Sequence, residues 1–211
     1  DAVCAQLSCL RPPSSNSSTP NLYAWQFGDV ACKKSNGIYT VALGMMGHAG
    51  TIESALATIE AIHLWHPRYI FFTGIAGGLS GLNKGDVIIA DIIYGYEYGK
   101  IDKSFLPRGN WTYKADKGLL NGASAYALRP NWHERIQMIP PVKTVPKVIS
   151  GEIASGDKVV DNPTNDFFIQ VLKAWPKIKA VEMEGAGVGC AMEQAHSLGF
   201  VVGFVMVRGI S

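Results

Sequence analysis

The sequence of 211 residues is 47% hydrophobic and 17% charged, which fits one globular domain whose core needs no disulfide or metal. A net charge of +2 and the absence of any Lys/Arg block argue against a nucleic-acid partner. No signal peptide opens the sequence, no apolar run is long enough to cross a bilayer, and the cysteines form no CxxC pair. We therefore expect a cytoplasmic protein with reduced thiols and no membrane partner.

Apolar strand patterns and helical patterns alternate along the chain after a Pro/Ser-rich loop predicted at residues 11–20. Strands are predicted at residues 38–45, 68–73, 86–93, 147–154, 178–183 and 200–207. Helices are predicted at residues 51–65, 115–128, 163–174 and 185–198, and the rest of 95–146 is expected to be loop. Because the strands are apolar along their whole length, the pattern predicts an α/β fold with a mostly parallel sheet covered on both faces.

The helix predicted at residues 51–65 has an amphipathic pattern. Ile52, Leu56, Ile59 and Ile62 recur at helical spacing, and the glutamates of this segment lie elsewhere on the helix.

Glycines and polar residues gather directly after four predicted strands, at residues 74–78, 155–158, 182–185 and 208–211. In open α/β sheets, ligands bind outside the carboxyl ends of the strands. The distribution therefore predicts a small-molecule site. The glycines match neither the dinucleotide-binding fingerprint nor a P-loop.

Glu182 and Glu184 lie two residues apart, so in an extended segment they point to the same side. A carboxylate near a buried strand end must be hydrogen-bonded, and a sugar diol offers two hydroxyl donors to one carboxylate. An ion pair with Arg208 satisfies the same requirement. Both interpretations stay open at this point.

The spacing Gly44-x-x-Gly47-x-x-Gly50 before a helix could present backbone amides to an anion, although a plain strand–helix turn explains it equally well. His48 in this turn is the one histidine of interest. The aromatic residues Trp65, Trp175, Phe71 and Phe72 are expected in the core rather than as platforms for a base.

The motifs GIAGGL, KGDVIIAD, SGD, VEMEG and VRGIS, in this order, resemble the nucleoside phosphorylase superfamily. Within it, the similarity is greatest to methylthioadenosine/S-adenosylhomocysteine nucleosidases, and it runs from Ile38 to Ser211. The resemblance implies a twisted central mixed, largely parallel sheet flanked by helices, in a protein that forms homodimers or higher oligomers and is in some cases fused to other domains. It implies no metal and no organic cofactor.

The resemblance also implies roles for individual residues. Glu184 would take the 2′ and 3′ hydroxyls of the ribose, and Arg208 and Ser211 would position the catalytic acid. Lys158 could meet a phosphate group on the substrate. The implied substrate-binding set is Ala76, Gly77, Lys158, Val159, Val160, Glu182, Met183 and Glu184.

The sequence departs from the family pattern at both ends. The family's general acid would follow Ser211, and its water-activating Glu would precede Asp1, where residues 1–3 resemble the helix after that Glu. We therefore expect residues 1–211 to form a single domain truncated at both ends, without the first strand and the C-terminal helix.

Two further departures bear on the reaction. Val159 stands where related nucleosidases often carry an aromatic residue, which predicts weaker stacking on the base. Phe72 and Ile75 stand where hexameric phosphorylases place an Arg and a Ser that bind phosphate, which favours water as the nucleophile. The expected function is a purine nucleoside or nucleotide N-ribohydrolase. The alternatives are a purine nucleoside phosphorylase and a non-catalytic nucleotide-binding sensor.

Overall fold

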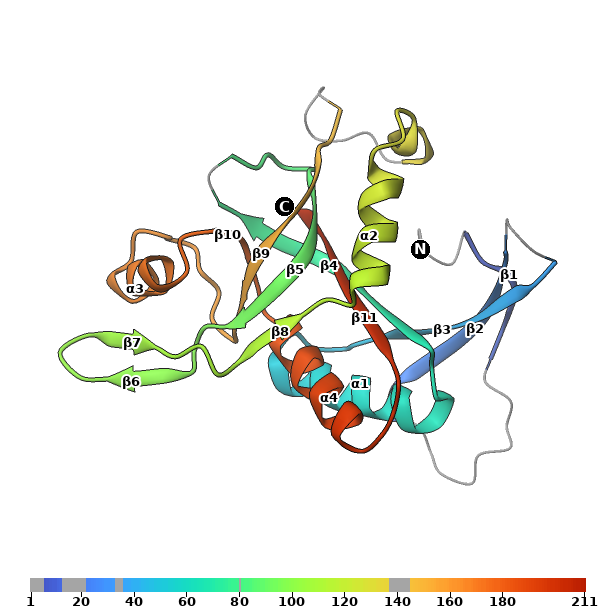
Figure 1. The fold of residues 1–211 in the computed structure, drawn as a ribbon, viewed down its shortest axis with the longest axis horizontal. Helices are drawn as coiled ribbons and strands as arrows, with labels where there is room; N and C mark the ends of the chain where they lie inside the picture. The colour runs from blue at the N-terminus through green and yellow to red at the C-terminus, as the bar shows by residue number, and fades with distance from the viewer. Residues whose placement is uncertain (1–5, 13–21, 33–35, 80, 137–144) are drawn as a thin grey trace.

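The computed structural model describes residues 6–12, 22–32, 36–79, 81–136 and 145–211 (Figure 1). In this part of the chain the helices are α1 (Thr51–Trp65), α2 (Lys117–Ala127), α3 (Asp166–Ala174), α4 (Gly185–Ser197) and the 3-10 turn η2 (Trp132–Arg135). The strands are β1 (Ser8–Arg11), β2 (Ala24–Ala31), β3 (Ile38–Met45), β4 (Tyr69–Gly78), β5 (Val87–Gly95), β6 (Gly99–Ile101), β7 (Phe105–Pro107), β8 (Thr112–Lys114), β9 (Val148–Ser155), β10 (Ile178–Glu182) and β11 (Gly203–Ile210).

Every predicted strand and helix is present, and the bounds of β3 and α1 are confirmed at both ends. The largest shift is at β4, which runs five residues past its predicted end at position 73 because β11 pairs with its glycines, Arg208 with Gly74 and Ile210 with Ala76. The α3 helix begins later than predicted because the Asn165 side chain accepts a hydrogen bond from the Phe167 amide and caps it there.

Two expectations about irregular segments were wrong. Strands β6, β7 and β8 lie in the segment expected to be loop apart from one helix. Arg11 belongs to β1, which pairs with β2, rather than to a loop. Its guanidinium supports this pairing by contacting both carboxylate oxygens of Asp29 at 2.9 and 3.1 Å. The rest of the predicted Pro/Ser-rich loop, residues 13–20, lies outside the described residues, as do residues 1–3.

The central sheet has the strand order β11-β4-β10-β9-β5-β8, and an additional pairing of β5 with β11 closes five of these strands into a ring. Parallel pairs join β11 to β4, β10 to β9 and β9 to β5, whereas β4–β10, β5–β11 and β5–β8 are antiparallel. The sheet is therefore mixed, as the resemblance implies, and its two longest pairings, β11–β4 and β5–β9, are parallel. Helices flank it, with α1 and α4 side by side and α2 on another flank (Figure 1).

A second sheet of order β1-β2-β3 is antiparallel throughout. The pattern analysis missed β2, because Gly28 and Asp29 interrupt its β-favouring residues. Its aromatic residues Trp25 and Phe27 pack edge-on against Trp65 of α1, with ring centroids 6.4 and 4.9 Å away.

The α1 helix turns its predicted apolar face outward. Ile52, Leu56 and Ile59 are 72%, 46% and 38% exposed, and only Ile62 of that stripe is buried. The glutamates instead hold β2, since Glu60 accepts from the Trp25 indole at 2.8 Å and Glu53 from the Tyr23 hydroxyl at 2.8 Å. Burial and the Glu53 hydrogen bond raise the pKa of Tyr23 to about 12. The residues buried under α1 are Ser54, Thr58 and Ile62, so a polar face of this helix meets the rest of the domain.

Candidate active site

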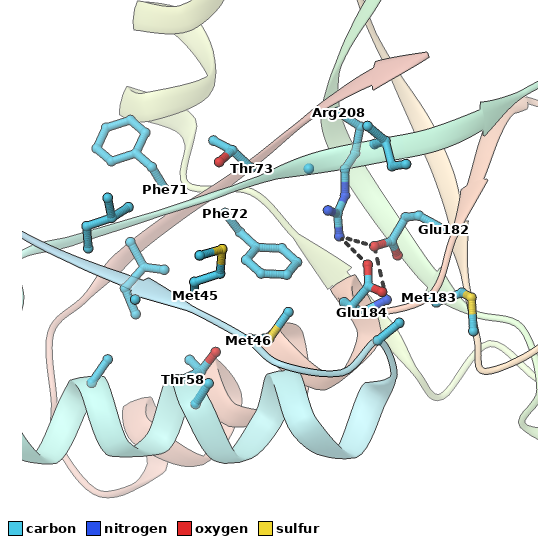
Figure 2. A pocket seen from close by; sticks show the side chains of 18 of the residues that line it. Met45, Met46, Thr58, Phe71, Phe72, Thr73, Glu182, Met183, Glu184 and Arg208 are labelled. Carbon is cyan, nitrogen blue, oxygen red and sulfur yellow. Dashed lines mark hydrogen bonds and ion pairs between the residues drawn. The ribbon is translucent and has the colours of Figure 1, made fainter. Parts of the chain in front are cut away.

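An open cavity of about 1940 Å³ lies at the carboxyl ends of β4, β10 and β11. All of the residues predicted for the site line it: Ala76, Gly77, Lys158, Val159, Val160, Glu182, Met183, Glu184, Arg208 and Ser211. The cavity is larger than the ~300–1,000 Å³ typical of a small-molecule pocket, because it continues between β3 and β4. Figure 2 shows this part, which is lined by Met45 and Met46 and by Phe72 of β4.

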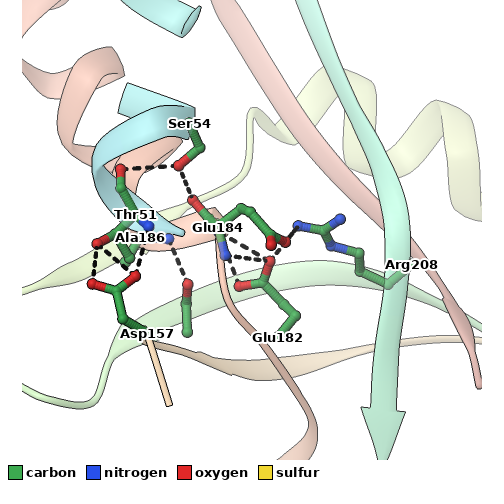
Figure 3. A network of polar contacts seen from close by, with 9 residues as sticks. Thr51, Ser54, Asp157, Glu182, Glu184, Ala186 and Arg208 are labelled. Carbon is green, nitrogen blue, oxygen red and sulfur yellow. Dashed lines mark hydrogen bonds and ion pairs between the residues drawn. The ribbon is translucent and has the colours of Figure 1, made fainter. Parts of the chain in front are cut away.

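The polar centre of the cavity is a cluster of Arg208, Glu182 and Glu184 (Figures 2 and 3). Arg208 Nη2 donates to Oε2 of Glu182 and, at 3.0 Å, to Oε2 of Glu184. Arg208 and Glu182 are 3% and 4% exposed. Burial of these charges is tolerated only because they are paired. The ion pair that the sequence left open is therefore present, and it includes both glutamates.

Arg208 is held by two residues of β4. Its Cζ lies 4.5 Å from the centroid of the Phe72 ring, which is a cation–π contact. A Cβ on Gly74 would lie only 1.9 Å from Nη1 of Arg208, so any other residue at that position would displace the guanidinium from its present place. Nε of Arg208 is buried and has no hydrogen-bond partner among the described residues. The guanidinium is thus held in a fixed orientation, and its Nε–H group remains available as a hydrogen-bond donor.

The two glutamates have different partners. Glu182 ends β10, and its carboxylate accepts from the backbone amides of Glu184 at 3.1 Å and Gly185 at 2.9 Å, which fixes the first turn of α4. Ser155 Oγ accepts from the next amide, that of Ala186, at 2.7 Å. Glu184 lies beyond the strand and is the N-cap residue of α4, with a partly exposed side chain. Glu184, rather than Glu182, is therefore the carboxylate available to a ligand.

The environment of Glu184 raises the pKa of its carboxyl group above the ordinary value of 4.5. Burial is the largest cause and the neighbouring Glu182 charge adds to it, whereas Arg208 and a hydrogen bond from the Gly50 amide act in the opposite direction.

The backbone amides at the start of α1 bind anionic groups, as the glycine spacing allowed. These groups are carboxylates of the chain itself. The Gly50 amide donates to the Glu184 carboxylate, and the Thr51 amide donates to Oδ1 of Asp157 at 2.7 Å. The positive end of the α1 dipole therefore faces two carboxylates of this chain.

The apolar part of the cavity corrects one expectation. Phe71, expected in the core, is 62% exposed and lines the cavity with the partly buried Phe72. Lys158, the residue predicted to meet a phosphate, lines the cavity and pairs with Glu97 at 2.5 Å, with its side chain 59% exposed. Val159 is 78% exposed at the cavity wall, where His48 also lies.

The sequence reasoning missed Phe72 as a support for Arg208, and it missed Ser54, which donates to the Glu184 carbonyl, and Asp157, which accepts from Thr51. One signal for Ser54 was available: Ser54 and Thr58 stand four residues apart in the helix, a spacing that places both on one face. In the described part of the chain, no group of three or more His, Cys, Asp and Glu side chains could hold a metal ion. No helix there is long and apolar enough to cross a membrane.

Comparisons with known proteins identify the family of this chain. The family model described as the Phosphorylase superfamily matches residues 24–211. The 5′-methylthioadenosine/S-adenosylhomocysteine nucleosidase of Geobacillus sp. strain WCH70 is 31% identical over 172 residues, which cover 77% of this chain and 63% of the relative. The nucleosidase of the same description from Desulfotalea psychrophila is 29% identical over 192 residues, 85% of this chain and 71% of the relative.

Among solved structures, that of the 5′-methylthioadenosine/S-adenosylhomocysteine nucleosidase from Neisseria meningitidis, in complex with methylthio-immucillin-A, superimposes with a TM-score of 0.70 at 22% identity. The superposition covers 99% of this chain and 79% of that chain. At this level of sequence identity, the superposition shows that the two chains share a fold.

Proposed function

Since the chain belongs to the phosphorylase superfamily, we propose that it forms most of the catalytic domain of a purine nucleosidase, an enzyme that hydrolyses the bond between the base and the ribose. The observation that carries the proposal is the position of Glu184, whose carboxylate lines the cavity beside a buried arginine that keeps it oriented. The names of the relatives favour substrates of the 5′-methylthioadenosine and S-adenosylhomocysteine type.

In this proposal the ribose binds with its 2′ and 3′ hydroxyls on Glu184. Cleavage of the glycosidic bond develops positive charge on the ribose in an oxocarbenium-like transition state, and a nearby carboxylate stabilises that charge. Ala76 and Gly77 lie along the base and ribose, and Met183, Val159 and Val160 supply apolar contacts. These roles agree with the place of each residue on the cavity wall.

The general acid and the residue that holds the attacking water are proposed to come from segments that flank this chain. The acid, an Asp after Ser211, would protonate N7 of the purine. Ser211 lies beside Ala76, to whose carbonyl its amide donates at 3.1 Å, and the buried Nε of Arg208 retains a donor that such an Asp could accept. The superposition on the Neisseria structure covers 99% of this chain and 79% of that chain, so part of that chain has no counterpart among the present residues.

The first strand that the resemblance implies has a fitting place in the cavity between β3 and β4. Outside its short pairing with β10, β4 has only β11 as a partner, and β3 pairs only with β2 among the described strands. Exposed apolar side chains line this space, including Tyr39, Met45 and Phe71. We propose that one further strand of the domain pairs here and buries them.

Water is favoured over phosphate as the nucleophile. Phe72 and Ile75 offer no polar side-chain group to a phosphate, and the amides at the start of α1 are already bound to Glu184 and Asp157. The pairing of Lys158 with Glu97 likewise favours a nucleoside over a nucleotide substrate.

Base release by the full-length protein tests the proposal directly. Methylthioadenosine, S-adenosylhomocysteine, adenosine and AMP are each supplied with and without phosphate, and free adenine is measured. We expect release that does not depend on phosphate, with AMP the poorest substrate. Release only with phosphate would identify a phosphorylase, and saturable binding without release would identify a sensor domain.

We also propose a homodimer that forms through α1. Its outward face presents Ile52, Leu56 and Ile59, an apolar stripe of the kind that interfaces bury. Leu56→Glu would place a charge in the middle of the stripe, so it should yield monomers in sedimentation experiments at concentrations where the wild type is dimeric. Leu106→Glu, at an exposed leucine of β7, is the matched control and should leave the dimer intact. A wild type that sediments as a monomer would contradict the dimer.

A further inference from the structure

The first turn of α1 is held in place by a side chain from a distant part of the chain. Asp157, in the turn after β9, accepts from the Thr51 amide at 2.7 Å and from the Thr51 hydroxyl at 2.9 and 3.1 Å (Figure 3). The N-cap residue of α1 is Gly50, at φ 131°, which offers no side chain for capping. Asp157 therefore supplies, from 106 residues away, the cap that α1 lacks.

This capping differs from that of the neighbouring helices. Asp116 caps α2 and Asn165 caps α3, each from the N-cap position of its own helix. A remote cap has a consequence that a local cap lacks: it fixes the end of α1 relative to the turn after β9. That turn forms one wall of the candidate active site, where Lys158 and Val159 lie.

The same turn of α1 contacts Glu184 at two points. Ser54, which is fully buried, donates from Oγ to the Glu184 carbonyl at 2.7 Å, and the Gly50 amide donates to the Glu184 carboxylate. The approach is so close that a Cβ on Gly187 of α4 would lie 1.8 Å from the Thr51 carbonyl oxygen. A shift of the α1 terminus therefore moves both the backbone and the carboxylate of Glu184.

We propose that Asp157 and Ser54 are positioning residues that orient the Glu184 carboxylate toward the ribose, Asp157 by fixing the start of α1 and Ser54 by fixing the Glu184 backbone. The inference rests on the proposed function, in which Glu184 binds the ribose hydroxyls. It assigns no ligand contact to Asp157 or Ser54, so their effect must appear only for ligands that carry those hydroxyls.

The test compares three ligands that the proposed reaction cannot consume: carbocyclic adenosine, in which a methylene group replaces the ring oxygen of the ribose, its 2′,3′-dideoxy form, and adenine. Binding to the full-length protein is measured by titration calorimetry for the wild type and for Asp157→Ala and Ser54→Ala. For each variant we expect carbocyclic adenosine to bind about 10-fold more weakly, the order expected for one lost cap or hydrogen bond, with the other two ligands unchanged within about twofold. Asn165→Ala removes the cap of α3 and serves as the matched control, with no change for any of the three ligands.

Asp157→Asn adds a check that does not depend on a large loss of structure. Asparagine keeps one acceptor oxygen for the Thr51 amide, so we expect it to retain most of the affinity for carbocyclic adenosine. Equal weakening of all three ligands, or unchanged binding of carbocyclic adenosine in both alanine variants, would overturn the positioning role. A wild type that binds none of the three ligands would instead contradict the proposed function, and the ribose role of Glu184 with it.

Discussion

Replacing Arg208 with methionine is expected to lower the free energy of unfolding by about 3–5 kcal/mol, the cost of breaking a buried ion pair from one side. The reason is that Arg208 is the cation paired with both Glu182 and Glu184, and Glu182 is almost fully buried. Methionine has a similar length and is apolar, so the loss comes from the charge rather than from an empty space. Urea denaturation of the wild type and the variant measures the difference.

The loss of unfolding free energy in Arg208→Met should increase as the pH rises. Arg208 lowers the pKa of Glu184, so its removal raises that pKa further above 4.5. A carboxyl group whose pKa is raised in the folded state costs stability once the pH exceeds its unfolded value. The difference between variant and wild type should therefore be smallest near pH 4.5 and grow toward neutral pH.

Arg129→Met is the matched control, because Arg129 is exposed and stacks on Tyr126. Its effect should stay within about 0.5 kcal/mol. A loss for Arg208→Met no larger than that of the control would show that the cluster does not need its cation.

The position of polar groups at strand ends was predictable, since glycines and polar residues follow four predicted strands. Which strand ends meet was not predictable. β4 lies between β10 and β11, parallel to β11 and antiparallel to β10 over its last residues, and this arrangement brings Glu182 and Arg208 together. The two-residue spacing of Glu182 and Glu184 did not reveal their separate roles. Those roles depend on β10 ending at Glu182, which frees Glu184 to begin the next helix.

The orientation of α1 could not be read from its pattern. Hydrophobic periodicity identifies an apolar stripe but not which surface covers it. Here Glu60 accepts a hydrogen bond from Trp25 of β2 and Glu53 accepts one from Tyr23, just before β2, and the apolar stripe faces outward. The pattern also missed β2, because the side chains that stabilise this strand belong to α1. The role of Phe72 depends on cross-strand neighbours in the same way, since its contact with Arg208 arises from the pairing of β4 with β11.

Replacing Glu184 with glutamine is expected to lower kcat for base release by about 10- to 100-fold, the order of the contribution that a charged partner makes to a hydrogen bond. Glutamine can still hydrogen-bond the ribose hydroxyls, so KM should change less than kcat. What it lacks is the negative charge that stabilises the developing positive charge on the ribose. The measurement is steady-state release of adenine from methylthioadenosine by the full-length protein.

The pH profile separates this role from a loss of structure. Burial raises the pKa of Glu184, so the wild type should lose its ionised form, and with it kcat, at a higher pH than an exposed glutamate would allow. Glutamine does not titrate, so Glu184→Gln should lose the part of the acidic limb that Glu184 causes. Glu193→Gln, on the exposed side of α4, is the matched control and should keep both the rate and the limb. If Glu184→Gln retained the wild-type rate and the wild-type profile, the ribose hydroxyls would have to bind elsewhere in the cavity.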